Sequence, residues 1–494
     1  MRYTSTRDAS LSKSASECFL QGISVDGGLF VPESFPEITL AEINKMAEMS
    51  YQERAFMMLS RYLTDFSEDE LKNCISSAYG SKFDSLGVAP LHYLSKSNAV
   101  MELYHGPTLA FKDVALQILP HFLKTAKAKM GEKDRIVILV ATSGDTGKAA
   151  LEGFADVEGM GIGVFFPNQG VSKMQQLQMT TQTGNNVFVC AVNGNFDDAQ
   201  TGVKNIFADA NIKAELKARG IKLSSANSIN WGRLVPQIAY YFSAYADLLR
   251  DKKISLGDKV NFVVPTGNFG DILAGYYALR MGLPVNKLIC ASNKNNVLTE
   301  FFETGVYNAK REFYKTSSPS MDILISSNLE RLLFELSGKD DKYVSSLMAE
   351  LKQKGSYKVS DRVFEQLNSV FAAGYVDESA TAETIKSMWE NENYCIDTHT
   401  SVGCAVYENH KKSSGDGTFT VMLSTASPYK FPHSVLDAIF GTAPADEFDC
   451  ADKLKSMGVK EPVQIVELKG KKVLHSLVCD KDKMAETMLA WAEK

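Results

Sequence analysis

The feature that most constrains the fold of this chain is a series of apolar runs separated by stretches of helical pattern. The run at 135–141 is almost continuously apolar, which is typical of a strand buried on both faces of a parallel sheet. Shorter runs of the same kind lie at 163–166, 186–192, 259–264, 288–291 and 418–423. Between the runs, helical spacing marks residues 148–155, 172–181, 231–249 and 271–281. This alternation predicts an α/β fold whose parallel sheets carry helices on both faces.

The two ends of the chain differ from this pattern. Residues 1–85 are predicted to form a mainly helical region, because 40–63 and 68–79 carry helical apolar spacing. Residues 441–494 form a C-terminal region of short helices with one mostly apolar run at 462–466.

The central region, 86–440, holds the sheet pattern and is expected to be the working part of the molecule. Within it, 135–225 form a smaller unit, and we expect this unit to shift as a body to exclude water during a reaction. Residues 325–390 are helical in pattern and more charged, so we interpret them as a helical insertion that interrupts the sheet.

Composition excludes several classes of function. The net charge of −6 argues against a protein that binds nucleic acid through overall basicity. A bilayer span needs about 18 or more consecutive apolar residues, and the sequence has no such run. The start of the chain lacks the apolar core of a secretory signal, and the eight cysteines are scattered. That scatter argues against a zinc site or a disulfide scaffold and favours reduced thiols in a cytoplasmic protein.

Lys112 is the first residue whose surroundings suggest chemistry. It follows a Gly-Pro turn at 106–107, adjoins Phe111 and begins a helical pattern. Partial burial would disfavour the ammonium form and lower the pKa of this lysine. A neutral amine can form an imine with an aldehyde. The alternative is a solvated lysine in the first turn of a helix, which is the commoner case for this residue type.

A glycine-rich turn, 263–275, follows one predicted strand and opens a helix. Gly267 and Gly270 allow a tight turn whose amides, with the helix dipole, suit an anion. The turn lacks the Lys-Ser or Lys-Thr pair of a nucleotide-binding P-loop and misses the dinucleotide spacing, so a single phosphate monoester is the better ligand. The alternative is a connection whose glycines serve only packing. We expect the Asp271 carboxylate to turn away from the cup and accept hydrogen bonds from amides or a hydroxyl.

Two more strand ends carry polar groups. Residues 141–148 repeat the strand–turn–helix construction with hydroxyls that suit a carboxylate, or else Thr142 or Ser143 simply caps the helix. Two anion cups and an imine-forming lysine together require an aldehyde with a phosphate handle, and pyridoxal 5′-phosphate meets that requirement. Thr425, just after the run at 418–423, offers a hydroxyl to the ring nitrogen of such a cofactor. Its alternative is a buried threonine with local hydrogen bonds.

These motifs, taken in order, resemble those of the threonine synthases. The resemblance rests on His105-Gly106-Pro107-Thr108 with Phe111-Lys112-Asp113, on 142–147, on 267–271 and on Ser424-Thr425-Ala426. It is nearest to the longer branch of that family, whose extended N-terminal region is similar to the run at 26–32. It covers nearly the whole chain.

The resemblance implies a fold type II enzyme dependent on pyridoxal phosphate, similar to the tryptophan synthase β subunit. The chain would have two parallel-sheet α/β domains and, in addition, a helical N-terminal region and a helical insertion. By resemblance, Lys112 binds the cofactor covalently, and Thr425 lies at the ring nitrogen. The phosphate-cup motif comprises Gly267, Asn268, Phe269, Gly270 and Asp271. The wider superfamily often has Asn where this chain has Asp145, which leaves the contact of Asp145 with the cofactor open.

The implied reaction turns O-phospho-L-homoserine and water into L-threonine and phosphate. Lys112 would act as the base and proton shuttle. For the substrate carboxylate we expect Ser143 and Thr146, and for its phosphate a set in the run 227–233 that consists of Ser228, Asn230 and Arg233. The alternative for that run is helix capping by Ser228 or Asn230 with Arg233 solvated. Lys430 is a second cationic candidate, and His105 is expected to be structural.

Two rival functions remain open from the sequence. One is a serine or threonine dehydratase-like lyase with the same cofactor, which would release a keto acid and ammonia. The other is a non-catalytic metabolite-binding protein that keeps the fold, although the presence of Lys112 speaks against it. The sequence does not decide between a monomer and a homodimer.

Overall fold

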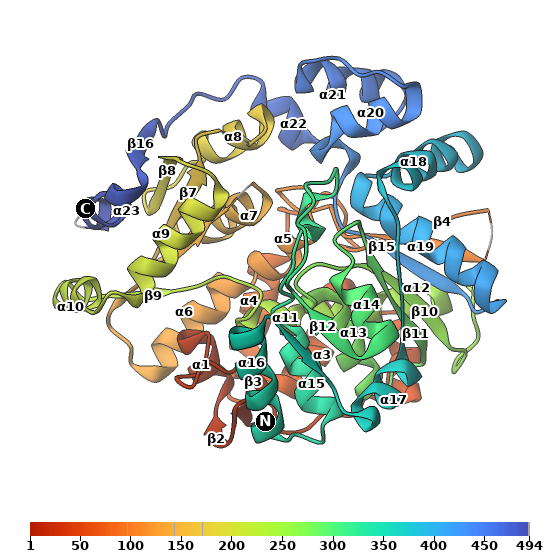
Figure 1. Cartoon of the computed structure of the whole chain (residues 1–494), viewed down its shortest axis with the longest axis horizontal. Helices are drawn as coiled ribbons and strands as arrows, with labels where there is room; N and C mark the ends of the chain where they lie inside the picture. The colour runs from red at the N-terminus through yellow and green to blue at the C-terminus, as the bar shows by residue number, and fades with distance from the viewer. Residues whose placement is uncertain (96, 143, 170, 493–494) are drawn as a thin grey trace.

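Two sheets form the framework of the computed structural model, which describes residues 1–95, 97–142, 144–169 and 171–492 (Figure 1). Among these residues the larger sheet has the order β14-β11-β10-β15-β5-β4, and the smaller has the order β16-β8-β7-β6-β9. The larger sheet comprises β4 (Leu91–Tyr93), β5 (Asn98–Glu102), β10 (Val260–Pro265), β11 (Val285–Ser292), β14 (Phe371–Tyr375) and β15 (Thr420–Ser424). The smaller sheet comprises β6 (Arg135–Ala141), β7 (Met160–Pro167), β8 (Val187–Asn193), β9 (Ile221–Ser224) and β16 (Leu477–Asp480). Neighbouring strands run parallel except β4 and β5, which confirms the predicted fold class.

The larger sheet is covered on both faces because successive side chains of a strand point to opposite sides. Phe262 and Val264 of β10 join a core cluster with α12 (Ile238–Arg250) and α13 (Gly270–Arg280). Val263, between them, joins another cluster with α19 (Thr398–Ser414). A continuous apolar strand is therefore what this architecture requires.

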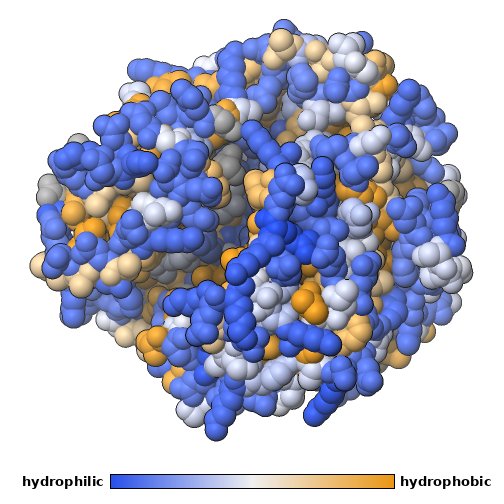
Figure 2. Space-filling view, in the orientation of Figure 1, coloured by the Kyte–Doolittle hydropathy of each residue, from blue (hydrophilic) through white to orange (hydrophobic). Residues whose placement is uncertain are grey.

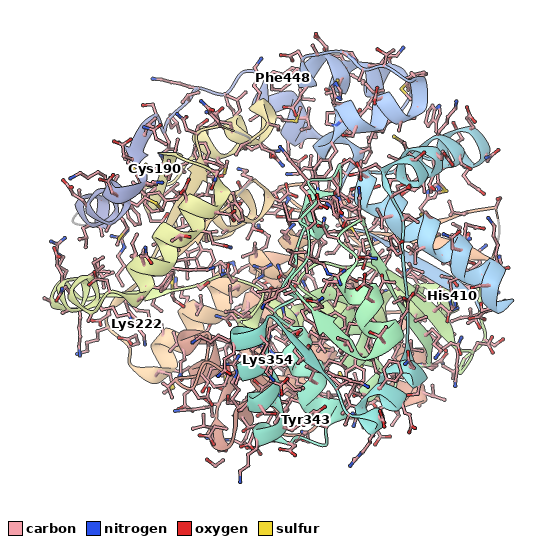
Figure 3. The ribbon with its side chains drawn as sticks, viewed as in Figure 1. Cys190, Lys222, Tyr343, Lys354, His410 and Phe448 are labelled. Atoms are coloured by element: carbon pink, nitrogen blue, oxygen red, sulfur yellow. The ribbon has the colours of Figure 1, made fainter. Side chains whose placement is uncertain are left out.

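The smaller sheet follows the same rule. Ile136 and Ile138 of β6 pack with α7 (Asp145–Phe154), whereas Val137 and Leu139 pack with α9 (Phe196–Ala208) and α23 (Met484–Ala492). The C-terminal strand β16 completes this sheet next to β8, so residues outside 135–225 belong to it as well. Cys190 marks β8 in Figure 3.

Two predicted helices are broken in the structure. The stretch 40–63 forms α2 (Leu40–Met46) and α3 (Tyr51–Tyr62), because Ser50 caps α3 in a capping box with Glu53. The stretch 231–249 forms α11 (Trp231–Leu234), the 3₁₀ turn η1 (Val235–Gln237) and then α12, since Pro236 has no N–H to continue a helical ladder.

The N-terminal region adds a three-stranded antiparallel sheet to its helices. The strands are β1 (Tyr3–Ser5), β2 (Asp8–Lys13) and β3 (Phe30–Pro32). The further helices are α1 (Ala15–Gln21) and α4 (Glu68–Ala78).

The segment expected to be a helical insertion is not wholly helical. It contains α15 (Leu329–Leu336), α16 (Asp341–Lys354), α17 (Asp361–Val370) and most of α18 (Glu378–Glu392). It also contains β13 (Ser356–Lys358), which pairs antiparallel with β12 (Val306–Asn308) from the preceding part of the chain. It also supplies β14, which pairs in parallel with β11 at the edge of the larger sheet. The sequence of β14, Phe371-Ala-Ala-Gly-Tyr, is rich in small residues, so it lacks the apolar run that marks the other strands.

The C-terminal region links the two sheets. The apolar run at 462–466 lies mostly in α22 (Val463–Leu468), and α20 (Pro432–Phe440) and α21 (Glu447–Ser456) precede it. Phe448 of α21 lies beside α8 (Lys173–Thr180) of the smaller unit, with Lys173 Nζ 5.9 Å from its ring centroid (Figure 3). The remaining elements are α5 (Lys112–Leu116), α6 (Leu119–Met130), α10 (Ala210–Ala218), α14 (Val297–Thr304) and the 3₁₀ turns η2 (Pro319–Met321), η3 (Pro428–Lys430) and η4 (Lys481–Lys483).

The arrangement directs the ends of several strands toward one region. The loops after β5, β6, β10 and β15 all leave the carboxyl ends of their strands, where ligands bind in open α/β sheets. Figure 2 shows that the surface is hollowed between the lobe of the smaller unit, at the left, and the rest of the molecule. No helix within the described residues has the length and apolarity needed to cross a bilayer.

Candidate active site

Lys112 begins α5 and points its amine into a largely buried cluster. Its Nζ donates a hydrogen bond to Ser320 Oγ at 3.2 Å and lies 3.8 Å from Asp145 Oδ2. Burial, together with the positive charges of Lys430 and Arg233, lowers the pKa of Lys112, while Asp145 opposes the shift. The lowered pKa expected from the sequence is thus confirmed, with desolvation as its main cause.

The loop before Lys112 is pinned by its own neighbours. Asp113 accepts hydrogen bonds from the Thr108 amide at 2.8 Å and the Thr108 hydroxyl at 2.7 Å. Gly106 lies so close that a Cβ there would be 2.4 Å from the Asp113 Cβ, so this position requires glycine. Leu109 has a φ of 62°, which is unusual for a residue with a side chain and indicates local strain.

His105 is a structural residue of this loop, as expected. Its ring lies between Asp84, with Nδ1 2.5 Å from Oδ1, and Glu102, with Nε2 2.8 Å from Oε2. Burial opposes the charged ring, but these two carboxylates raise the pKa of His105 to about 9. An imidazole that keeps its proton to this pH ties β5 to the lysine loop.

Thr425 lies beside Lys112 through backbone contacts. The Phe111 amide donates to the Thr425 carbonyl at 2.9 Å, and Ala110 forms a bridge with Ala426. The strand end that carries Thr425 is therefore next to the amine, although its role at a ring nitrogen stays a prediction.

The glycine turn 267–270 opens α13 with amides that have no partner. The backbone N–H groups of Asn268, Phe269, Gly270 and Asp271 donate to no acceptor among the described residues. Phe269 is held at a φ of 64°, which directs the turn into the helix. Free amides at a helix N-terminus form an anion site, as the sequence predicts.

The turn and Lys112 meet at Ser320. A Cβ on Gly267 would lie 2.6 Å from the Ser320 carbonyl oxygen, so the two backbones are in direct contact. The Ser320 hydroxyl in turn accepts from Lys112. The amine and the anion cup therefore both contact one residue, which brings them within the reach of a small cofactor.

Asp271 turns away from the cup. Tyr241 donates to its carboxylate at 3.2 Å, and Tyr240 donates to the same oxygen. Burial raises the pKa of Asp271 to about 6. The expected contact with a neighbouring hydroxyl is confirmed, and it keeps a negative charge away from the free amides.

Asp145 connects the smaller unit to the lysine cluster. Its Oδ1 lies 2.8 Å from Lys430 Nζ, and the side chains of Lys430 and Asp145 are only 1% and 8% exposed. Burial alone would raise the pKa of Asp145, but the positive charges of Lys430 and Lys112 hold this pKa well below its usual range. The carboxylate is thus an anion between two amines.

Thr142, in the loop between β6 and α7, holds the start of that helix. Its Oγ1 accepts hydrogen bonds from the Gly144 and Gly147 amides, each at 3.0 Å, which supports the alternative that this residue caps the helix. Thr146 lies half-buried in α7. Ser143 lies outside the described residues.

The three residues proposed for a substrate phosphate have different surroundings. Asn230 is fully buried, caps α11 through the Gly232 amide at 3.0 Å and donates to the Phe19 carbonyl at 3.1 Å. These contacts support the capping alternative for Asn230, and its role as a phosphate ligand stays a prediction. Ser228 accepts from Asn328 at 3.1 Å and lies beside Gly270 at the cup.

Arg233 keeps the properties of an anion ligand. It is buried, not solvated, and its Nε has no hydrogen-bond partner among the described residues. Burial lowers the pKa of Arg233 to about 10, which still leaves the guanidinium charged. A buried cation with a free donor calls for an anion.

Sequence reasoning missed residues that hold the cup in place. Asn328 donates to the Asn268 carbonyl through its amide N–H at 3.1 Å and its side chain at 2.9 Å. Arg331 binds Asn328 and donates to the carbonyls of Phe30 at 2.9 Å and Ile229 at 2.6 Å. These residues come after a segment of irregular backbone and not after a predicted strand, so the pattern of polar groups at strand ends did not mark them.

Comparison with known proteins agrees with this geometry. The family model for the threonine synthase N terminus matches residues 2–79, that for pyridoxal-phosphate-dependent enzymes matches 86–425, and that for the threonine synthase C-terminal part matches 400–472. A threonine synthase from Pseudomonas aeruginosa is 41% identical over 453 residues, which cover 92% of this chain and 93% of that protein. The chain belongs to the threonine synthase family.

Other relatives extend the comparison. The crystal structure of a threonine synthase from Brucella melitensis with bound pyridoxal phosphate superposes with a TM-score of 0.89, at 37% identity and full coverage of both chains. Human threonine synthase-like 1 is 39% identical over 439 residues, and the match spans 87% of this chain but only 58% of that protein. This member of the threonine synthase family is therefore a fold type II pyridoxal-phosphate enzyme.

The residues present fit that cofactor. Lys112 supplies a buried amine of lowered pKa, as an imine requires. The amides of 268–271 supply unpaired donors for a phosphate, and Gly267 leaves room for the backbone contact at Ser320. Which residues hold each part of the cofactor stays a prediction.

Proposed function

We propose that this threonine synthase family member converts O-phospho-L-homoserine and water into L-threonine and phosphate. The observation that carries the proposal is a buried cation beside the amine, Arg233, whose Nε has no hydrogen-bond partner among the described residues. Arg233 and Lys430 lie in one electrostatic cluster with Lys112, in which Asp145 pairs with the two lysines and Asp113 is the second carboxylate. One cofactor phosphate is accounted for by the neutral amides of the cup. The remaining cationic groups favour a substrate that brings a second phosphate.

Lys112 is proposed as the base. Its lowered pKa favours the neutral amine, whose lone pair can take a proton from the carbon that bears the substrate amino group. Pyridoxal phosphate, when bound, supplies the electron sink that makes this carbon acidic. The same Nζ then returns protons to later positions of the substrate.

Arg233 and Lys430 are proposed to hold the substrate phosphate, with Ser228 at the edge of the cup. Arg233 offers an unpaired Nε. Lys430 pairs with one oxygen of Asp145, which leaves other N–H groups of its ammonium for a phosphate. Ser143 and Thr146 remain our candidates for the substrate carboxylate, because the positive end of the helix dipole at the start of α7 favours an anion.

Closure of the smaller unit is proposed to exclude water until phosphate has left. Asp145 on α7 and Gln178 on α8 both contact Lys430, with Gln178 Oε1 3.3 Å from Nζ, so the lysine joins the two sides of the cleft. The eight free cysteines are buried, in keeping with the proposed reducing, cytoplasmic setting. A monomer and a homodimer both remain compatible with this proposal.

The direct test measures inorganic phosphate released from O-phospho-L-homoserine by wild type and by Lys112→Ala, both saturated with pyridoxal phosphate. We expect release with equimolar threonine from wild type and loss of nearly all activity in the variant. Equal rates in the two proteins would exclude Lys112 as the base. Ammonia and a keto acid from serine or threonine, without phosphate release, would support the dehydratase-like alternative. No turnover of either substrate class would support a non-catalytic binding protein.

A further inference from the structure

Ser320 contacts both the reactive amine and the glycine turn of the phosphate cup. It lies in η2, within an irregular segment that the sequence motifs did not mark. Its hydroxyl accepts from Lys112 Nζ at 3.2 Å, and its carbonyl oxygen lies against Gly267. Among the described residues, no other hydroxyl hydrogen-bonds to this amine.

A buried histidine fixes the backbone of Ser320. The Ser320 amide donates to His399 Nε2 at 3.1 Å, so this nitrogen acts as an acceptor and carries no proton. The proton of the neutral ring is then on Nδ1, which donates to Asp397 Oδ2 at 2.8 Å. Asp397 and His399 are 0% and 2% exposed, and Asp397 also caps α19 through the Thr400 amide. The position of Ser320 is therefore tied to the start of a long helix.

The residues before Ser320 are anchored as well. Thr398 Oγ1 donates to the Ser317 carbonyl at 2.7 Å, and Asn293 donates to the Ser318 carbonyl at 3.3 Å. The turn is thus held on both sides by groups that take no part in the Lys112 contact. Such support is what holds a reactive group within a narrow range of geometry.

We infer that Ser320 is a catalytic residue that aims the free amine of Lys112, and that Asp397 and His399 form its positioning pair. The inference rests on the proposed function of Lys112 as the base. A lysine has a flexible four-carbon stem, so its amine needs a fixed partner to present its lone pair in one direction. A hydroxyl can occupy one N–H group without favouring the ammonium form, whereas a carboxylate at the same distance would raise the pKa. Asp145 lies farther from Nζ and is bound by Lys430.

The test uses covalent attachment of pyridoxal phosphate to Lys112 in the cofactor-free protein, followed by stopped-flow absorbance. This step needs the aimed amine but no substrate. We expect Ser320→Ala to slow attachment at least about tenfold at equal cofactor concentration, with kcat for phosphate release reduced by a similar factor and KM little changed. Ser317→Ala is the matched control, because it removes a hydroxyl of the same loop that has no hydrogen bond within the described residues.

The positioning pair is tested by two replacements of His399. His399→Gln keeps an acceptor for the Ser320 amide, whereas His399→Leu does not, and both lose the ring that packs 4.9 Å from Phe431. We expect the glutamine variant to attach the cofactor at close to the wild-type rate and the leucine variant to be as slow as Ser320→Ala. These variants also carry the test if Ser320→Ala does not fold.

Two results would overturn the inference: a wild-type attachment rate in Ser320→Ala, or equal rates in folded His399→Gln and His399→Leu. Failure of the proposed function is distinguishable from both. In that case wild type would release no phosphate from O-phospho-L-homoserine, while attachment would still be slowed in Ser320→Ala and not in Ser317→Ala.

Discussion

Gly267 gives the sharpest test of how the phosphate cup is built. A methyl group added there would lie 2.6 Å from the Ser320 carbonyl oxygen, and 3.6 Å from the Met321 Cα. An ordinary contact between such atoms needs roughly 3.4 Å, so the turn or its neighbour must move by about 0.8 Å (3.4 − 2.6). The obstacle is backbone, which a side-chain rotation cannot relieve. Overpacking of this kind typically costs about 1–3 kcal/mol.

If that strain falls on the cup, Gly267→Ala should bind pyridoxal phosphate about 5- to 150-fold more weakly, since each 1.4 kcal/mol is a factor of ten. Cofactor titration followed by the visible absorption band measures the affinity, and thermal unfolding of the cofactor-free protein measures the strain that remains in the fold. Gly417→Ala is the control, because a Cβ at Gly417 meets nothing within 4 Å. Wild-type cofactor affinity and wild-type thermal stability in Gly267→Ala would refute the packing argument.

Three further predictions concern the supports of the site. Lys430→Met should lower the free energy of unfolding in urea by about 3 kcal/mol, because Asp145 loses its nearest buried cation. Adding Asp145→Asn to this variant should restore most of that stability. An unchanged free energy of unfolding in the single variant would contradict the prediction. The pKa of His105 is raised to about 9 from 6.5, so its stabilising effect is complete below pH 6.5 and is lost as the pH rises through about 9. The unfolding free energy should fall by up to about 3 kcal/mol over that range, and an equal fall in His105→Gln would exclude this cause. Arg331→Met should weaken pyridoxal phosphate binding in the absorbance titration, because Asn328, which donates to the Asn268 carbonyl, loses its hydrogen bond to Arg331. Unchanged affinity in a folded variant would show that the cup does not need this support.

The sequence predicts site residues best where they lie at the end of a strand or the start of a helix. Lys112, the turn at 267–270 and Thr425 each follow a strand or begin a helix. The structure brings Lys112 and the turn together at Ser320, and it places Thr425 against the lysine loop. Apolar runs located the strands for the same reason, since a strand buried on both faces must be apolar throughout.

Site residues that lie on irregular backbone could not be predicted from the sequence. Ser320 sits in a turn with no periodic signal, and His399 reaches it from α19, 79 residues further along the chain. Asn230 shows a different difficulty, because a polar residue before a helix has the same sequence pattern whether it binds a ligand or caps the helix. The burial of Asn230 and its contact with Phe19 favour the cap.

The central claim is that Lys112 and the turn at 267–270 hold one cofactor between them. The most direct measurement is borohydride reduction of the protein loaded with pyridoxal phosphate, followed by mass spectrometry of its peptides. We predict that the reduced cofactor is found on the peptide that contains Lys112, and that Gly267→Ala needs more cofactor to reach the same occupancy. A reduced cofactor on Lys430 or on another lysine, with Lys112 unmodified at full loading, would contradict the account.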